Sequence, residues 1–100
     1  MKPVHLSPAA QADVEDIWDY TETTWGSAQA EKYIGDIQQT CHGVATGRAI
    51  VRSAESIRAG YQRSNVGSHV LYFKELEDRF VIVRILHQKM DVGRYIAERS

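Results

Sequence analysis

The chain has 100 residues, of which 43% are hydrophobic and 25% charged, and its formal net charge is −1. This length and composition predict one globular domain over residues 1–100 and exclude a disordered chain. The single cysteine, Cys41, excludes an internal disulfide framework and a multi-cysteine zinc site. We find no apolar run long enough to span a membrane and no apolar signal-peptide core after Met1, which predicts a cytoplasmic protein.

Charge is distributed unevenly along the chain. Residues 1–45 contain two lysines and seven acidic residues, a net charge of −5. Residues 46–100 contain ten Lys or Arg and six acidic residues, a net charge of +4. This asymmetry can steer a charged partner, although two solvated surfaces of opposite sign would give the same pattern.

A short strand and two helices are predicted in the first half. Residues 4–6 alternate as a strand does, and Ser7-Pro8 then favours a helix start, because Ser7 can accept a backbone N–H and Pro8 lacks one. Gly26 interrupts the helical pattern, Ser27 can cap a second helix and Gly47 can end it, so we expect an antiparallel helical hairpin. The expected apolar stripes are Ala10, Val14, Ile17, Trp18, Thr21 and Trp25 on the first helix, and Ala30, Tyr33, Ile34, Ile37, Cys41 and Val44 on the second.

Three strands and a short helix are predicted in the second half. Residues 48–59 have no clear period and are interpreted as a connector; strand patterns follow at 61–65, 69–76 and 80–87. Asp91 can cap a last helix through Ala97. On the last strand, we expect Val81, Val83 and Ile85 to pack on the helical hairpin, and Phe80, Ile82, Arg84 and Leu86 to face the other side.

This order, β-αα-βββ-α, predicts an α+β fold in which a helical hairpin packs on a small antiparallel sheet with a short C-terminal helix. The face of the sheet that contains Arg84 is expected to be only partly covered, by the C-terminal helix or by a partner.

Metal-binding and catalytic motifs are sparse. The four histidines lie on different predicted elements without a metal-ligand spacing, so we expect no metal and no cofactor. We interpret Cys41 as a buried small hydrophobe and the acidic pairs of the first helix, such as Asp13 and Asp16, as solvated. The sequence contains no GxSxG motif and no glycine-rich phosphate loop, and no catalytic residue is assigned.

Basic and aromatic residues concentrate on the last strands and the final helix. Such a surface can hold RNA through phosphate contacts and stacking, or an acidic protein segment through charged hydrogen bonds. Arg84 is the most informative of them, because an arginine among strand hydrophobes needs a partner once it is desolvated. The residues are Arg63, His69, Arg84, Lys89 and Arg94, interleaved with Tyr61, Tyr72 and Tyr95.

Three segments of the chain resemble the ParE toxins, which belong to the ParE/RelE superfamily of bacterial toxin–antitoxin systems. They are SPAAQADVEDIW at residues 7–18, GSHVLY at residues 67–72 and RILHQKMD at residues 84–91. The resemblance extends over essentially the whole chain, so residues 1–100 are expected to form one ParE/RelE-like toxin domain. It implies the same fold that the element order predicts.

The resemblance also implies partners and a target. It implies a ParD-type antitoxin, in a heterotetramer or larger complex, and bacterial DNA gyrase as the target, poisoned by protein–protein contact without catalysis. We expect no sequence-specific DNA binding by the toxin alone. The expected contacts to target or antitoxin are Arg63, His69, Arg84, His87, Met90, Asp91, Arg94 and Tyr95.

Two alternatives stay open from the sequence. One is a RelE-like, ribosome-dependent mRNA endonuclease that would use His69, Arg84 and Tyr95; the other is an interaction domain that has lost its target contact. RNA cleavage needs a base, a proton donor and cations for the phosphorane. The 61–63 segment has no lysine, and Met90 stands near the place of the ribonucleases' C-terminal functional residue, so the sequence favours gyrase poisoning.

Overall fold

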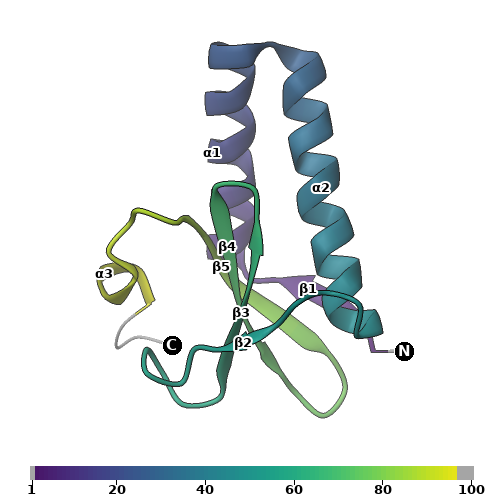
Figure 1. The fold of residues 1–100 in the computed structure, drawn as a ribbon, viewed down its shortest axis with the longest axis vertical. Helices are drawn as coiled ribbons and strands as arrows, with labels where there is room; N and C mark the ends of the chain where they lie inside the picture. Colours follow the sequence, from purple (N-terminus) through teal and green to yellow (C-terminus); the bar gives the residue numbers. More distant parts are fainter. Residues whose placement is uncertain (1, 97–100) are drawn as a thin grey trace.

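The computed structural model describes residues 2–96 and confirms the predicted α+β class (Figure 1). The paired helices extend well beyond the sheet on which their lower half packs (Figure 1). A two-residue strand, β2, occurs inside the segment expected to be a connector, and Ala97 of the predicted last helix lies outside the described residues. The elements are β1 (Val4–Leu6), α1 (Pro8–Trp25), α2 (Ser27–Thr46), β2 (Arg52–Ser53), β3 (Tyr61–Val66), β4 (His69–Glu75), β5 (Phe80–His87) and α3 (Val92–Ile96).

The sheet is mixed, because β1 runs parallel to β5 whereas the other neighbouring strands are antiparallel. The strand order is β1-β5-β4-β3-β2. β1 ends at Leu6, opposite Ile82, so the outer edge of β5 beyond Ile82 is left to α1. Ser7 makes this transition: its Oγ accepts from the Ala10 N–H at 3.0 Å, as predicted for a cap, and donates to the Val83 carbonyl at 2.7 Å.

Glycine sets the limits of the second helix. Gly26 has a φ of +96° and occupies the position before α2, so Ser27 is the first helical residue and the prediction that it caps the helix was wrong. Gly47, with a φ of +79°, ends α2 as predicted.

A β-bulge in β5 reverses part of the predicted facing pattern. Tyr72 pairs with Arg84 but its neighbour Phe73 pairs with Ile82, which leaves Val83 without a partner of its own. The extra residue shifts the two-residue alternation by one position. The hairpin is therefore packed by Phe80, Ile82 and Ile85, and the expectation for Val81 and Val83 was wrong, whereas that for Ile85 is confirmed.

The buried face of α1 is more polar than its sequence suggests. Its buried residues are Ala10, Asp13, Ile17 and Thr21. Thr21 satisfies its hydroxyl locally by donating to the Ile17 carbonyl at 2.7 Å. Trp18 is partly buried, whereas Trp25 is 71% exposed, so the assignment of Trp25 to the buried stripe was wrong.

The stripe of α2 is confirmed. Ala30, Ile37, Cys41 and Val44 are buried, and Tyr33 and Ile34 are partly buried against the sheet. The outward faces of both hairpin helices are largely polar, although α1 exposes Tyr20 and Trp25. Within residues 2–96 we find no helix sufficiently long and apolar to traverse a lipid bilayer.

A second, smaller core covers the opposite face of the sheet. Ile96 of α3 and Ala54 of the connector close over it, which confirms that the C-terminal helix covers this face. Tyr61 and Tyr72 are only 2% and 6% exposed there. The sequence had suggested that these rings could stack on RNA, but neither is accessible for that contact. The buried members are Ala54, Tyr61, Val70, Tyr72, Leu86 and Ile96.

Tyr33 of α2 holds the turn between β3 and β4. Its hydroxyl accepts from the Ser68 N–H at 3.0 Å and lies 3.1 Å from the Val66 carbonyl. Gly67 stands between these residues with a φ of +57°, and a Cβ built on it would lie 2.5 Å from the Tyr33 ring. Only glycine fits this turn, for reasons of both backbone conformation and space.

Gly67→Ala is therefore expected to lower the free energy of unfolding by about 1–3 kcal/mol, through overlap with Tyr33 and an unfavourable φ. Gly35, in the middle of α2, is the matched control, because a Cβ there would meet no atom within 4 Å. Gly35→Ala should instead stabilise the protein by roughly 0.5–1 kcal/mol. Urea denaturation of both variants measures this, and equal effects of the two would contradict the role given to Tyr33.

Candidate functional site

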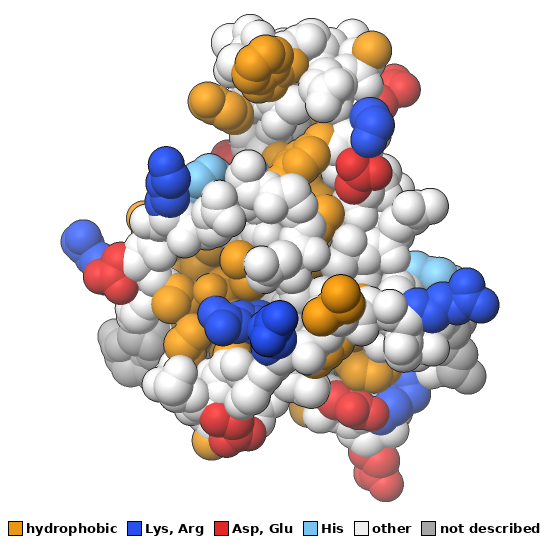
Figure 2. Space-filling view, viewed as in Figure 1, with side chains coloured by type: hydrophobic (Ala, Val, Ile, Leu, Met, Phe, Trp, Pro, Cys, Tyr) orange, Lys and Arg blue, Asp and Glu red, His pale blue; other side chains and the backbone are white. Residues whose placement is uncertain are grey.

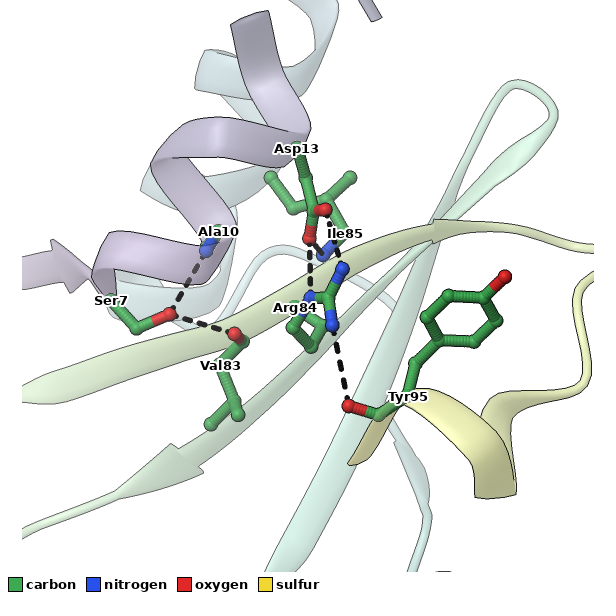
Figure 3. A network of polar contacts seen from close by, with 7 residues as sticks. All are labelled: Ser7, Ala10, Asp13, Val83, Arg84, Ile85 and Tyr95. Atoms are coloured by element: carbon green, nitrogen blue, oxygen red, sulfur yellow. Dashed lines mark hydrogen bonds and ion pairs between the residues drawn. The ribbon is translucent and has the colours of Figure 1, made fainter. Parts of the chain in front are cut away.

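The polar centre of the molecule is an ion pair between Asp13 of α1 and Arg84 of β5 (Figure 3). The Arg84 Nε donates to Asp13 Oδ2 at 2.8 Å and its Nη2 donates to Oδ1 at 2.7 Å, a bidentate arrangement. Asp13 Oδ2 also accepts the Ile85 backbone N–H at 2.9 Å. Asp13 was expected to be solvated but is 8% exposed, because it faces the edge of β5 that β1 leaves open.

Arg84 joins this pair to the C-terminal helix. Its Nη1 donates to the Tyr95 carbonyl at 3.2 Å, and the guanidinium lies 5.5 Å from the centre of the Tyr95 ring (Figure 3). Hydrogen bonding to Asp13 raises the pKa of Arg84 above its ordinary value, against the opposing effect of desolvation. The expectation that Arg84 needs a partner once it is desolvated is confirmed within the chain, since its side chain is 21% exposed and donates to Asp13 and to the Tyr95 carbonyl. Its contact with a target or antitoxin stays a prediction.

A second group consists of His69 and His87, which face each other across β4 and β5. Their rings meet edge to face with centres 5.3 Å apart, and the Tyr33 hydroxyl lies 2.7 Å from His69 Nδ1. His87 Nδ1 accepts the Lys89 N–H at 3.1 Å. Burial lowers the pKa of His69 below its ordinary value, with a further lowering by His87 and an opposing effect of Asp13.

Of the remaining predicted contact residues, Tyr95 joins the ion pair through its contact with Arg84, whereas most of the others lie apart from both groups. Met90, Asp91, Arg94 and Tyr95 are exposed on the segment that leaves β5 and on α3, with Tyr95 46% and Met90 45% exposed. Arg63 lies on β3, separated from β5 by β4, and is exposed. The structure thus divides the predicted site into a buried ion pair with α3, a histidine pair and a distant arginine.

The structure contains a groove near Arg63 that the sequence did not predict. It has a volume of about 650 Å³ and lies between the C-terminal half of α2 and the β2–β3 edge, lined in part by Arg48, Arg52 and Arg63. The available signal was Arg48 and Arg52 in the 48–59 segment without hydrophobic period, followed by Arg63 on the next predicted strand. Because the segment shows no strand pattern, the sequence did not predict that Arg52 pairs with Arg63 across two neighbouring strands.

Neither a metal site nor a reactive thiol emerges from the described residues. Between residues 2 and 96, no three His, Cys, Asp or Glu side chains are grouped so as to hold a metal ion. Cys41 is buried, which confirms its assignment to the core, and burial raises the pKa of its thiol to about 11. At neutral pH the thiol is protonated and is a poor nucleophile.

Truncating the ion pair should destabilise the fold. Asp13→Ala leaves the Arg84 guanidinium and the Ile85 N–H without their acceptor, so we expect a loss of about 3–5 kcal/mol in the free energy of unfolding. Asp16→Ala is the matched control on the exposed side of the same helix and should change stability by no more than about 0.5 kcal/mol. Thermal or urea unfolding measures both, and similar stabilities of the two variants would refute the structural role of Asp13.

The lowered pKa of His69 predicts a pH-dependent stability. The folded protein binds fewer protons at this group than the unfolded chain does, so its contribution is complete above pH ~6.5 and is lost as the pH falls below that value. His69→Gln should therefore flatten the fall in unfolding free energy between pH 7.5 and pH 5.5. His42→Gln, on an exposed position of α2, is the control. A pH profile unaltered by His69→Gln would contradict the prediction.

Comparison with known proteins identifies relatives over nearly the entire chain. The family model described as the ParE toxin of the type II toxin–antitoxin system parDE matches residues 4–92. Toxin ParE1 of Mycobacterium tuberculosis is 44% identical over 90 residues, which cover 89% of this chain and 92% of the relative. Toxin ParE1 of Caulobacter vibrioides is 40% identical over 96 residues, which cover 96% and 99%.

Solved structures share the fold at low sequence identity. The chromosomal ParDE system from P. aeruginosa has a chain with a TM-score of 0.72 at 22% identity, covering 87% of this chain and 96% of that one. The E. coli DinJ–YafQ complex has a chain with a TM-score of 0.63 at 10% identity, covering 98% and 100%. The YoeB dimer of Staphylococcus aureus gives a TM-score of 0.62 at 15% identity, covering 86% and 95%.

Proposed function

Because the chain belongs to the ParE toxin family of type II toxin–antitoxin systems, we propose that it poisons bacterial DNA gyrase by protein–protein contact and is neutralised by a ParD-type antitoxin. The gyrase target rests on the resemblance of the whole chain to ParE toxins. Action by contact, without catalysis, rests on the bidentate pairing of Arg84 with Asp13.

The pairing of Arg84 bears on the ribonuclease alternative. A cation that stabilises a phosphorane must be free to bind phosphate oxygens as charge develops on them. The Arg84 guanidinium instead donates hydrogen bonds to Asp13 and to the Tyr95 carbonyl, and His69 lies against Tyr33 and His87. Arg84 and His69, two of the three residues that the ribonuclease alternative needs, are therefore engaged in contacts within the protein, which favours a toxin that binds its target.

The antitoxin partner has support from two of the structural relatives. The P. aeruginosa structure is named as a ParDE toxin–antitoxin system, and the E. coli structure is a complex of DinJ and YafQ. By analogy, the present chain functions in a hetero-oligomer with an antitoxin in the bacterial cytoplasm.

The gyrase contact is proposed at the segment that follows β5. Met90 and Tyr95 are among the large hydrophobic side chains exposed to solvent, and Asp91 and Arg94 are exposed beside them. Aromatic and arginine side chains are frequent energetic anchors of interfaces. The hydrogen bond from Arg84 to the Tyr95 carbonyl attaches α3 to β5, so the exposed side chains of this segment are held in a defined position on the surface.

Purified protein incubated with gyrase and plasmid should trap cleaved DNA, whereas translating ribosomes in a parallel reaction should leave mRNA intact. We expect Arg94→Ala to require at least about tenfold more protein for the same cleavage, since loss of an interface anchor costs roughly 1–2 kcal/mol or more. Arg79→Ala, in the β4–β5 turn where Arg79 pairs with Asp78, is the control and should poison normally.

Two results would count against this function. Ribosome-dependent cutting of mRNA by the unaltered protein would overturn the gyrase target and restore the endonuclease alternative. Full poisoning by Arg94→Ala and by Tyr95→Ala at an unchanged dose would move the gyrase contact to another surface.

A further inference from the structure

The groove beside β2 combines positive charge with exposed aliphatic surface. Arg48, Arg52 and Arg63 line it together with Ile50, whose side chain is 78% exposed. Figure 2 shows Lys and Arg side chains gathered beside hydrophobic ones on this face, over the region where Figure 1 places β2.

The arginines of this groove have no counter-charge of their own. Within residues 2–96, no ion pair or side-chain hydrogen bond occupies the guanidinium of Arg48, Arg52 or Arg63. The acidic residue lining the groove is Asp36, and its carboxylate binds Lys32 at 3.2 Å. The groove therefore presents three unpaired positive charges to a ligand.

The register of the sheet places two of these charges side by side. Arg52 of β2 is the direct antiparallel partner of Arg63 of β3, so both side chains leave the same face of the sheet. Like charges at directly opposite positions destabilise a strand pair. An acidic group bound between them would convert this repulsion into two favourable pairs.

The strand that carries Arg52 is also open along one side. β2 is the terminal strand of the sheet, with β3 on one side and, among the described residues, no strand on the other. An open edge can accept an added strand from a partner, whose backbone then pairs with it and whose side chains fill neighbouring pockets.

From these observations we propose that the groove lined by Arg48, Ile50, Arg52 and Arg63 is a docking site for an acidic, aliphatic polypeptide segment contributed by the antitoxin. This inference rests on the proposed function, in which an antitoxin is the partner. Two carboxylates of that segment pair with Arg52 and Arg63, and an aliphatic side chain covers Ile50.

A protein segment fits the groove better than a nucleic acid does. Single-stranded RNA is held by phosphate contacts together with bases stacked on aromatic rings, and the groove is lined by no aromatic side chain. Its exposed apolar group is Ile50, an aliphatic side chain that offers no ring for a base to stack on. Aliphatic contact with charge pairing is typical of an acidic peptide.

The test uses the full chain and its cognate ParD-type antitoxin. In the double variant Arg52→Gln/Arg63→Gln, we expect antitoxin affinity to fall at least tenfold and its dependence on salt between 50 and 300 mM to weaken. The melting temperature of the free toxin should stay the same or rise, because the repulsion between the two arginines is removed. A merely structural role for these residues would instead lower the melting temperature. Arg79→Gln, in the β4–β5 turn, is the matched control and should bind the antitoxin as the unaltered chain does.

Three outcomes would overturn the proposal. Antitoxin binding by the double variant at unaltered affinity and salt dependence would remove the groove from the interface while leaving the proposed function intact. Failure of the unaltered chain to bind a ParD-type antitoxin at micromolar concentration would instead refute the antitoxin partnership itself. Tight binding of a fluorescent single-stranded RNA that is lost in the double variant would assign the groove to nucleic acid.

Discussion

The carboxylate of Asp13 completes a sheet edge that the first strand leaves unfinished. β1 pairs with β5 only as far as Ile82, after which Ser7 bonds the Val83 carbonyl and Asp13 takes the Ile85 N–H. A bare edge at this position would leave buried backbone groups unsatisfied, which is costly. Because the same carboxylate binds Arg84 and Arg84 binds Tyr95, one charged pair joins the helical hairpin, the sheet and the C-terminal helix.

This use of Arg84 has consequences for function. Arg84 and His69 are occupied in holding elements together, whereas within residues 2–96 the guanidinium groups of Arg48, Arg52 and Arg63 are unpaired. Two separate surfaces are then open to partners: the segment after β5 with its exposed Met90 and Tyr95, and the groove at the opposite edge of the sheet. A toxin that binds both a target and an antitoxin therefore has a separate surface for each.

Local features of the sequence predicted most of the fold. The Ser7-Pro8 start, the α2 stripe and the end of α2 at Gly47 depend on residues a few positions apart, and all were predicted correctly. The bulge at Val83 depends on how β5 pairs with β4, which no local pattern encodes, so the facing of Phe80 and Ile82 was mistaken. The burial of Asp13 depends on a partner 71 positions away. The resemblance to ParE toxins identified the family, but it did not indicate that Arg84 is a structural residue or that Arg48 and Arg52 join Arg63 at a groove.

The central claim is that Asp13 holds Arg84, and NMR of the side-chain Nε–H of arginine tests it most directly. The account predicts that the Arg84 Nε–H gives a resolved signal at neutral pH whose exchange with water is far slower than that of Arg63, because Asp13 accepts it at 2.8 Å in a largely buried position. Exchange at the same rate as the exposed Arg63 would contradict the account, since Arg84 would then be free to serve as a cation for RNA or for a partner.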